Sequence, residues 1–279
     1  MAYKDLLVVL DTSPAGLRRI DLAAALAESF GAHLIGLYPR PKPRFSAAFG
    51  YYDPTLFDPL YREVADRLQR EGDELRRRFE HAAELRGVSA EWRSPEIAGD
   101  NNPAVHLRYV DLAIFGQRDP DRPSDDLFRF APETAALASG RPILVIPYAG
   151  NFAGVGRRVL VAWNASREAT RAVNDAMPLL ERADKVTVLV IDPAAGGHGE
   201  DPGADISLHL ARHGVKAEVE RTRAADMAVA DVLLSRAADL GADLMVMGLY
   251  GHSRARELLL GGASRGILET MTIPVLMSH

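Results

Sequence analysis

The chain has 279 residues, of which 47% are hydrophobic and 25% charged; none is cysteine, and the formal net charge is −5. This length suffices for one large domain or two ordinary ones. The lack of cysteine excludes disulfides and thiol catalysis and suits a reducing cytoplasm, where we expect the protein to lie. No apolar run approaches the ~20 residues that span a bilayer, and the negative charge offers no general attraction to nucleic acid or anionic lipid. We therefore expect neither a membrane nor a nucleic-acid partner.

In chain order, the first apolar run covers residues 6–10, which is too short for a signal peptide and predicts a buried strand. Residues 39–59 hold several prolines and aromatic residues and are too long for a bare connection. We expect them to form a flap that packs on the sister half, and a lid over a ligand site is the alternative. Two further apolar runs, 110–116 and 141–147, predict the last strands of the first half.

An internal repeat then begins. Residues 242–248 match 110–116, and 273–279 match 141–147, both in a register in which Val110 aligns with Ala242. The segment 159–166 likewise matches 6–13. Because the two halves start and end alike, we predict a first domain at 1–148, a glycine-rich linker at 149–156 and a second domain at 157–279.

In the second half, short continuous apolar runs alternate with helical patterns. Such runs predict parallel strands that are buried on both faces; they lie at 158–163, 186–191, 217–221, 244–248 and 274–277. With right-handed crossovers, this order predicts an α/β fold of two tandem, open, doubly wound parallel sheets of five strands each, Rossmann-like in topology.

A glycine loop follows the fourth strand of the second half, where an open parallel sheet binds its ligands. Its pattern is Gly-x2-Gly-x9-Gly, followed by a helix that is expected to begin near Ser264 or Arg265. Glycine lets backbone N–H groups approach a ligand closely, and a helix N-terminus favours an anion. The loop is thus suited to phosphate, although the glycines could also serve only to make turns.

This glycine pattern, ahead of a helix and the terminal Ile273-Pro-Val-Leu strand, resembles the nucleotide-binding signature of the universal stress protein family. The resemblance implies an adenine-nucleotide alpha-hydrolase-like fold and ATP as ligand, with Mg²⁺ only as its companion. It further implies that the ribose, phosphates and base are bound by the following residues: Ala162, Trp163, Asn164, Val190, Gly248, Gly251, Gly261, Gly262, Ala263 and Ser264. The sequence departs from the family pattern at Asn164, where an aspartate is usual, and at Gly262, where a serine or threonine is usual.

Three polar residues inside the loop, His252, Ser253 and Arg254, are further candidates for contacts with the ligand. Arg254 could fork onto phosphate oxygens or pair with Glu257 and solvent. His252 could donate to a phosphate or remain exposed. Ser253 lies in a near match to the hydrolase elbow Gly-x-Ser-x-Gly that lacks the last glycine, so we assign it hydrogen bonding rather than catalysis.

The first half lacks the later glycines of this loop. The repeat places Asp119 where the second half has Gly251, Arg129 where it has Gly261, and Phe130 where it has Gly262. A carboxylate and a bulky ring exclude phosphate, so we expect no triphosphate there, although Asp11 keeps the acid of the first strand.

No catalytic residue and no metal site are predicted. His209 and His213 stand one helical turn apart, but no third ligand is evident, and they fit a surface helix better. Since the loop offers neither a base nor metal-binding acids, ATP hydrolysis would be slow at most.

The leading hypothesis is a stress-response sensor or regulator that binds ATP or another adenine nucleotide in its second half. The alternative is a nucleotide-independent interaction protein or metabolite binder, whose halves pair through their last strands into a pseudo-dimer. Either function is compatible with a protein partner or a homodimer. A hydrolase that uses Ser253 is the third hypothesis.

Overall fold

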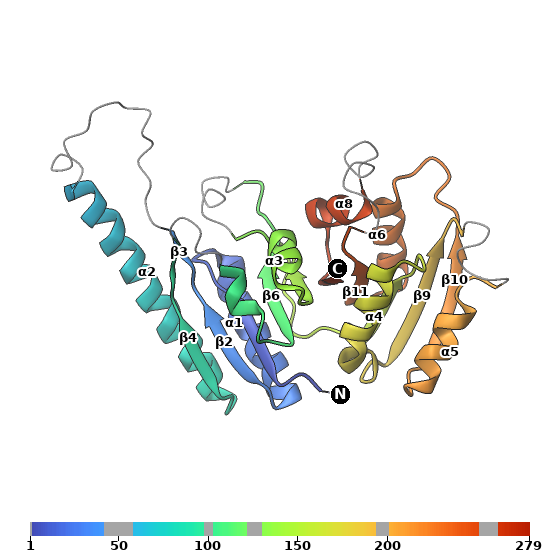
Figure 1. Ribbon diagram of the computed structural model, residues 1–279, viewed down its shortest axis with the longest axis horizontal. Helices are drawn as coiled ribbons and strands as arrows, with labels where there is room; N and C mark the ends of the chain where they lie inside the picture. Colours follow the sequence, from blue (N-terminus) through green and yellow to red (C-terminus); the bar gives the residue numbers. More distant parts are fainter. Residues whose placement is uncertain (1, 42–57, 98–102, 122–129, 194–200, 251–261) are drawn as a thin grey trace.

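The computed structural model describes residues 2–41, 58–97, 103–121, 130–193, 201–250 and 262–279. Its centre is one ten-stranded sheet in the order β10-β9-β8-β11-β12-β7-β6-β1-β2-β4 (Figure 1). Each half contributes five neighbouring strands, with the first strand of the half in the middle. The two predicted parallel sheets are therefore present, and they are joined edge to edge.

The first half contains β1 (Asp5–Val9), α1 (Pro14–Phe30), β2 (His33–Leu37), α2 (Asp58–Leu85), β4 (Ala90–Arg93), the 3₁₀ helix η2 (Pro103–Leu107), β6 (Leu112–Gly116), α3 (Pro132–Ser139) and β7 (Ile143–Ile146). A separate two-stranded sheet pairs β3 (Arg40–Pro41) with β5 (Glu96–Ile97). These two-residue strands were not expected, because so short a run carries no periodic signal.

The second half contains β8 (Arg158–Ala162), α4 (Arg167–Leu180), β9 (Lys185–Ile191), α5 (Ala204–Arg212), β10 (Ala217–Thr222), α6 (Val229–Asp239), β11 (Leu244–Gly248), α8 (Ala263–Thr270) and β12 (Val275–Ser278). Each predicted strand is present within a residue or two of its expected bounds. The predicted helix after the glycine loop begins at Ala263.

The halves meet where β7 and β12 pair antiparallel, as the alternative hypothesis anticipated for the last strands. Leu144 lies opposite Leu276 in this ladder. These leucines are equivalent in the repeat that aligns Val110 with Ala242, so an approximate two-fold axis passes between them. Every other pairing in the large sheet is parallel.

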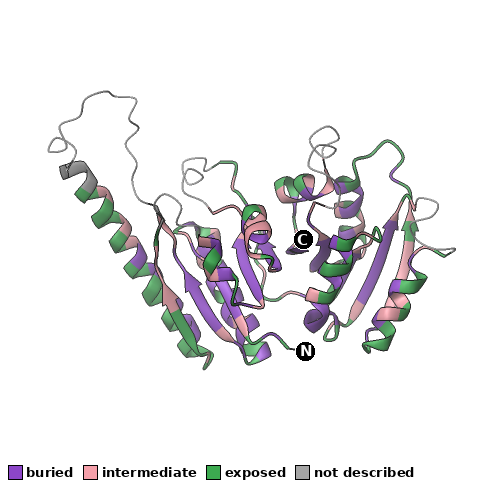
Figure 2. Ribbon diagram, viewed as in Figure 1, coloured by how far each residue is buried: buried purple, intermediate pink, exposed green. Residues whose placement is uncertain are grey.

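Helices cover both faces of the sheet, as a doubly wound fold requires. One core packs the strands against α1, α2, α4 and α5, and the other packs them against η2, α3, α6 and α8. The central strands are accordingly buried along most of their length (Figure 2). Because the winding reverses between β1 and β6 and between β8 and β11, these are the two places at which a ligand site is expected.

The repeated Val-Asp-Leu and Ala-Asp-Leu motifs have a structural role. In the first half Asp111 Oδ2 accepts hydrogen bonds from the backbone N–H of Lys4 and Asp5, at 2.6 and 3.1 Å. In the second half the Asp243 carboxylate accepts the N–H of Gly156, Arg157 and Arg158, at 3.0–3.1 Å. Each aspartate thus anchors the chain as it enters the first strand of its half.

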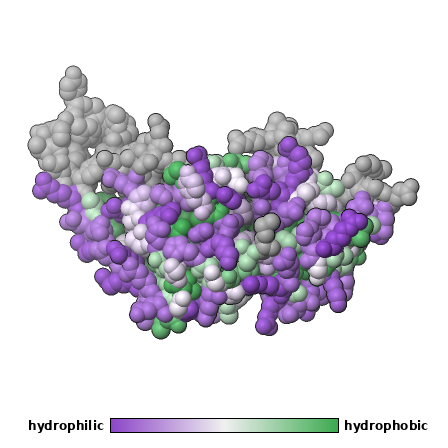
Figure 3. Space-filling view, turned by 60° about the horizontal axis from the view of Figure 1, so that its bottom comes forward, coloured by the Kyte–Doolittle hydropathy of each residue, from purple (hydrophilic) through white to green (hydrophobic). Residues whose placement is uncertain are grey.

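The halves also touch near the amino ends of the strands. Tyr3 donates from its hydroxyl to the carbonyl of Asp175 at 2.7 Å, and its ring meets Phe30 edge-on at 5.0 Å. The guanidinium of Arg182 lies 3.9 Å above the same Phe30 ring. Hydrophilic side chains cover most of the surface seen in Figure 3, with hydrophobic ones in smaller patches. Within the described ranges, no helix combines the length and apolarity needed to cross a bilayer.

Candidate functional site

The turns after β8 and β1 have the same pattern of side-chain hydrogen bonds. In the second half Asn164 Oδ1 accepts the N–H of Ser166 at 3.1 Å, and Ser166 Oγ caps α4 by accepting the N–H of Ala169. In the first half Asp11 Oδ1 accepts the N–H of Ser13 at 2.9 Å, and Ser13 caps α1 in the same way. An amide oxygen accepts this bond as well as a carboxylate does, so Asn164 preserves the turn.

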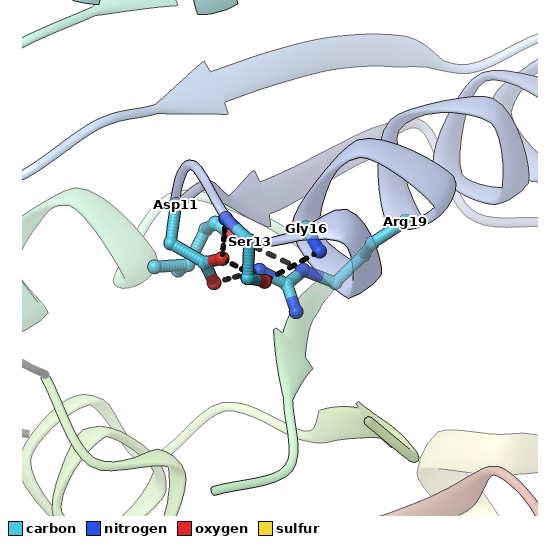
Figure 4. Close-up of polar contacts among 5 residues, drawn as sticks. Asp11, Ser13, Gly16 and Arg19 are labelled. Carbon is cyan, nitrogen blue, oxygen red and sulfur yellow. Dashed lines mark hydrogen bonds and ion pairs between the residues drawn. The ribbon is translucent and has the colours of Figure 1, made fainter. Parts of the chain in front are cut away.

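An ion pair between a buried arginine and a partly exposed aspartate occupies this region of the first half only. Arg19 is 3% exposed and lies 2.5 Å from Asp11 Oδ2, and its Nε donates to the carbonyl of Val9 at 3.0 Å (Figure 4). Its guanidinium reaches Gly116 at the end of β6, where an added Cβ would stand only 1.8 Å from Arg19 Nη1. The repeat aligns Arg19 with Ala172, which is fully buried in α4. Arginine and aspartate thus occur together in one half, and alanine and asparagine in the other.

The corresponding glycine of the second half, Gly248, packs on backbone instead. A Cβ at this position would come within 2.7 Å of the Ala169 nitrogen and 2.8 Å of the Glu168 carbonyl carbon. The first turn of α4 therefore lies directly against the end of β11. The first glycine of the loop is required for helix packing, whatever the loop binds.

Two aromatic residues, Tyr38 and Phe130, fill further positions in the first half. The N–H of Leu10 donates to the carbonyl of Leu37, and the N–H of its equivalent Trp163 donates to the carbonyl of Leu189. The next residues, Tyr38 and Val190, are therefore equivalent. The Tyr38 ring is buried and stacks on Trp92 with centroids 6.4 Å apart. Phe130, which replaces Gly262, packs on Phe115 at 5.7 Å. Large side chains therefore fill positions that are small in the second half.

The environment of Tyr38 predicts an alkaline loss of stability. Burial and the nearby Glu71 carboxylate raise the pKa of Tyr38 to about 12, whereas an unfolded tyrosine has a pKa of about 10. Below pH ~10 the hydroxyl is protonated in both states, so stability should fall only as the pH rises from about 10 to 12, by roughly 2–3 kcal/mol. Unfolding free energies of the wild type and Tyr38→Phe across this range test the prediction. Parallel pH profiles would show that the hydroxyl contributes nothing.

Ser264 joins the two ends of the glycine loop. Its hydroxyl accepts the N–H of Tyr250 at 3.2 Å and donates to the carbonyl of Gly248 at 3.3 Å, and the residue is only 5% exposed. We predicted that Ser264 lies near phosphates. Its side chain holds together the base of the loop, where β11 ends and α8 begins.

The N-termini of the two equivalent helices differ in their suitability for anions. Helix α8 starts after Gly262, which provides no side-chain cap, and its first turn carries no acid. Its first N–H groups have no partner inside the helix and favour an anion. Helix α3 starts with Pro132, which lacks an N–H, and carries Glu133 in its first turn. Of the two, only the α8 end is suited to phosphate.

Glu168 adds a negative charge on the other side of Gly248. Its side chain is 7% exposed and accepts from Arg167 at 3.2 Å. Burial raises the pKa of Glu168, but hydrogen bonds from its own backbone N–H and from Arg167 outweigh this, so the pKa lies below its ordinary value. The residue is therefore ionised at neutral pH. This charge makes α8, rather than α4, the favourable end for an anion.

Left-handed backbone is concentrated at the carboxyl edge of the second half. Among the described residues, four that are not glycine have a positive φ of 45–57°: Ala165, Asp192, Ala225 and Tyr250. One follows each of the strands β8, β9, β10 and β11. Such conformations cost roughly 1–3 kcal/mol each, persist only where the surrounding structure enforces them, and cluster at functional sites.

The structure describes some of the residues predicted to bind nucleotide. Ala162, Trp163 and Asn164 lie at the end of β8, and Gly262, Ala263 and Ser264 lie at the start of α8. Val190 lies on the neighbouring β9, but its side chain is fully buried and faces Gly203 and Val219. The loop candidates Gly251, His252, Ser253, Arg254 and Gly261 lie outside the described residues, as do Arg129 and most of the 39–59 segment.

Sequence reasoning overlooked Arg19 and Glu168. A signal for Arg19 was present, because aligning 6–13 with 159–166 and extending the match places Arg19 opposite Ala172 just as Asp11 stands opposite Asn164. The His209 and His213 rings do lie together, at 4.7 Å. Among the described residues, no group of three or more potential ligand side chains could hold a metal ion.

Comparison with known proteins supports the assignment of the fold. Residues 156–279 match the model of the universal stress protein family. A universal stress protein from Archaeoglobus fulgidus superposes with a TM-score of 0.74 over 98% of this chain and 95% of its own, at 16% identity. A functionally unknown protein from Pseudomonas aeruginosa gives 0.58 over 99% and 92%, at 15% identity. No curated protein sequence matches the chain.

The protein is a tandem, doubly wound α/β protein, and an approximate two-fold axis relates its two halves. The second half matches the universal stress protein family, and a tandem arrangement of two such domains fits the whole chain.

Proposed function

We propose that the second half binds ATP or another adenine nucleotide, and that the protein acts as a cytoplasmic sensor or regulator in stress responses. The base would lie by Ala162, Trp163 and Asn164, and the phosphates by the glycine loop and α8. Mg²⁺ would enter only with the nucleotide. The domain boundaries at 148 and 157 belong to the same proposal.

The contrast between the halves at their carboxyl edges carries this proposal. In the first half, Arg19 and its partner Asp11 lie at the end of β1, and the Phe130 ring lies ahead of α3, where both would disfavour a nucleotide. In the second half these positions hold Ala172, Asn164 and Gly262, and the uncapped N-terminus of α8 favours an anion. We therefore propose a single nucleotide site for each chain.

Nucleotide retained by the freshly purified protein, identified by mass spectrometry, and calorimetric titration with ATP, ADP and AMP test the proposal. We expect saturable binding of at least one of the three at one site per chain. Gly251→Asp introduces the residue that the first half carries at this position, and should weaken binding at least about tenfold through repulsion of phosphate.

Gly154→Asp is the matched control, because it adds the same charge in the linker, where an added Cβ has no neighbour within 4 Å. It should leave nucleotide affinity unchanged. If none of the three nucleotides is retained or binds, the nucleotide proposal fails and a nucleotide-independent role takes its place. Equal weakening by both substitutions would show that the glycine loop is not the site.

A further inference from the structure

A cavity lies between the halves, apart from the turn after β8. It has a volume of about 590 Å³, within the range of small-molecule sites. Its walls come from both halves, and its lining residues are Gln117, Arg118, Pro120, Pro132, Glu133, Tyr250, Arg265, Leu268 and Glu269. The ends of β6 and β11 and the helices α3 and α8 supply these residues.

The cavity straddles the approximate two-fold axis. The repeat aligns Arg118 with Tyr250 and Glu133 with Arg265, and all four line the cavity. The side chain of Gln117, which is 3% exposed, fixes the wall by donating to the carbonyls of Leu268 and Glu269 at 3.1 and 3.2 Å. Its Oε1 accepts the N–H of Tyr148. The two halves are therefore held in register around the cavity.

The charges in the cavity do not follow the symmetry of the fold. Glu133 stands on the wall of the first half where the second half has Arg265, so equivalent positions carry opposite charge. The N-terminal turn of α3 favours the carboxylate of Glu133. Arg265 is oriented by Glu269, whose Oε1 lies 2.8 Å from its Nε. At this pair of equivalent positions, identical chains would present two acids or two bases, whereas the tandem chain presents one of each. The lining also holds Arg118 and Glu269, the acid that pairs with Arg265.

We propose that this cavity binds a small zwitterion of amino-acid or dipeptide size. An ammonium group would pair with Glu133, and a carboxylate would pair with Arg265 and Arg118, since guanidinium groups fork onto carboxylate oxygens. A ligand with a single charge would meet a like charge on one wall. The Tyr250 ring and Leu268 provide the apolar surface that the middle of such a molecule requires.

The cavity adjoins the proposed nucleotide site through Tyr250, whose N–H bonds Ser264 at the base of the glycine loop. A zwitterion against Tyr250 would therefore act on the loop end that Ser264 holds. The backbone of Tyr250, the residue that the zwitterion would contact, is in the left-handed region, with a φ of 55°. Zwitterion binding itself does not depend on the nucleotide proposal.

Calorimetric titration of the full chain with each of the free proteinogenic amino acids and with glycyl dipeptides tests the inference. We expect saturable binding of at least one of them at one site per chain. The N-acetyl and carboxamide forms of that compound, each of which lacks one charge, should bind at least about tenfold more weakly. Absence of binding throughout the panel, or equal binding of the capped forms, would overturn the proposal.

Glu133→Gln and Arg265→Gln should each weaken zwitterion binding at least about tenfold while the far-UV spectrum is unchanged. Arg212→Gln, on the exposed face of α5, is the matched control and should have no effect. An unchanged affinity in Glu133→Gln would place the ligand elsewhere and contradict the proposal. ATP titrations of the same variants distinguish the two sites, because Glu133→Gln should leave nucleotide binding intact.

Discussion

Replacing Gly116 by alanine is expected to lower the free energy of unfolding by about 2–3 kcal/mol, although the change adds one methyl group. The added Cβ would stand 1.8 Å from Arg19 Nη1 and would force the guanidinium out of its place. Arg19 would then lose Asp11 and the Val9 carbonyl, and a charge that is 3% exposed would have no good partner. Separating a buried guanidinium from its partner in this way is costly.

A double-mutant cycle tests this explanation. Arg19→Ala alone should cost about 3 kcal/mol, because it removes the ion pair with Asp11, the hydrogen bond to the Val9 carbonyl and the packing of a side chain that is 3% exposed. The double variant should cost little more than Arg19→Ala, since the guanidinium that collides with the new methyl group is gone. The sum of the two single effects should therefore exceed the measured double effect by about 2 kcal/mol. Additive effects in chemical denaturation would contradict the proposed contact.

Gly248→Ala is expected to cost about 3 kcal/mol and to lower the melting temperature by about 5–10 °C. Unlike Gly116, Gly248 faces backbone atoms of Ala169 and Glu168, which cannot move unless α4 shifts as a whole. That shift would also displace the turn that holds Asn164. We therefore expect the nucleotide affinity proposed for the second half to fall with the stability.

Gly154→Ala serves as the control for both glycines, because it places the same methyl group where no atom lies within 4 Å. Its melting temperature should equal that of the wild type within error. If thermal denaturation shows Gly248→Ala to be equally harmless, then α4 does not pack on the end of β11 as described.

Much of the fold could be predicted from the sequence. The runs 244–248 and 186–191 are continuous apolar segments, because parallel strands between two layers of helices are buried on both faces, and they fall on β11 and β9. The repeat identified both halves, since the strand β6 and the strand β11 carry the same Asp-Leu motif. The two-stranded sheet of β3 and β5 could not be predicted, because a two-residue strand has no period.

The candidate site was less accessible from the sequence. The glycine pattern predicted a phosphate loop at 248–264, but residues 251–261 lie outside the described residues, and nucleotide binding remains a proposal. The sequence did predict the loss of this loop in the first half, from Asp119 and Phe130. It did not predict the contact of Arg19 with Gly116, because these residues lie far apart in the chain and meet only when α1 packs beside β6.

The sequence by itself determined the class of fold, the repeat, and which half carries the glycines of the proposed phosphate loop. Local patterns carry this information, because burial on two faces and close backbone approach each restrict residue type position by position. The tertiary structure alone decided the buried Arg19 pair, the packing of Gly248 on α4, and the charge-asymmetric cavity at Glu133 and Arg265. Each of these features joins residues from separate strands and helices, and their contacts arise only once the antiparallel pairing of β7 and β12 and the crossovers of each half bring those elements together.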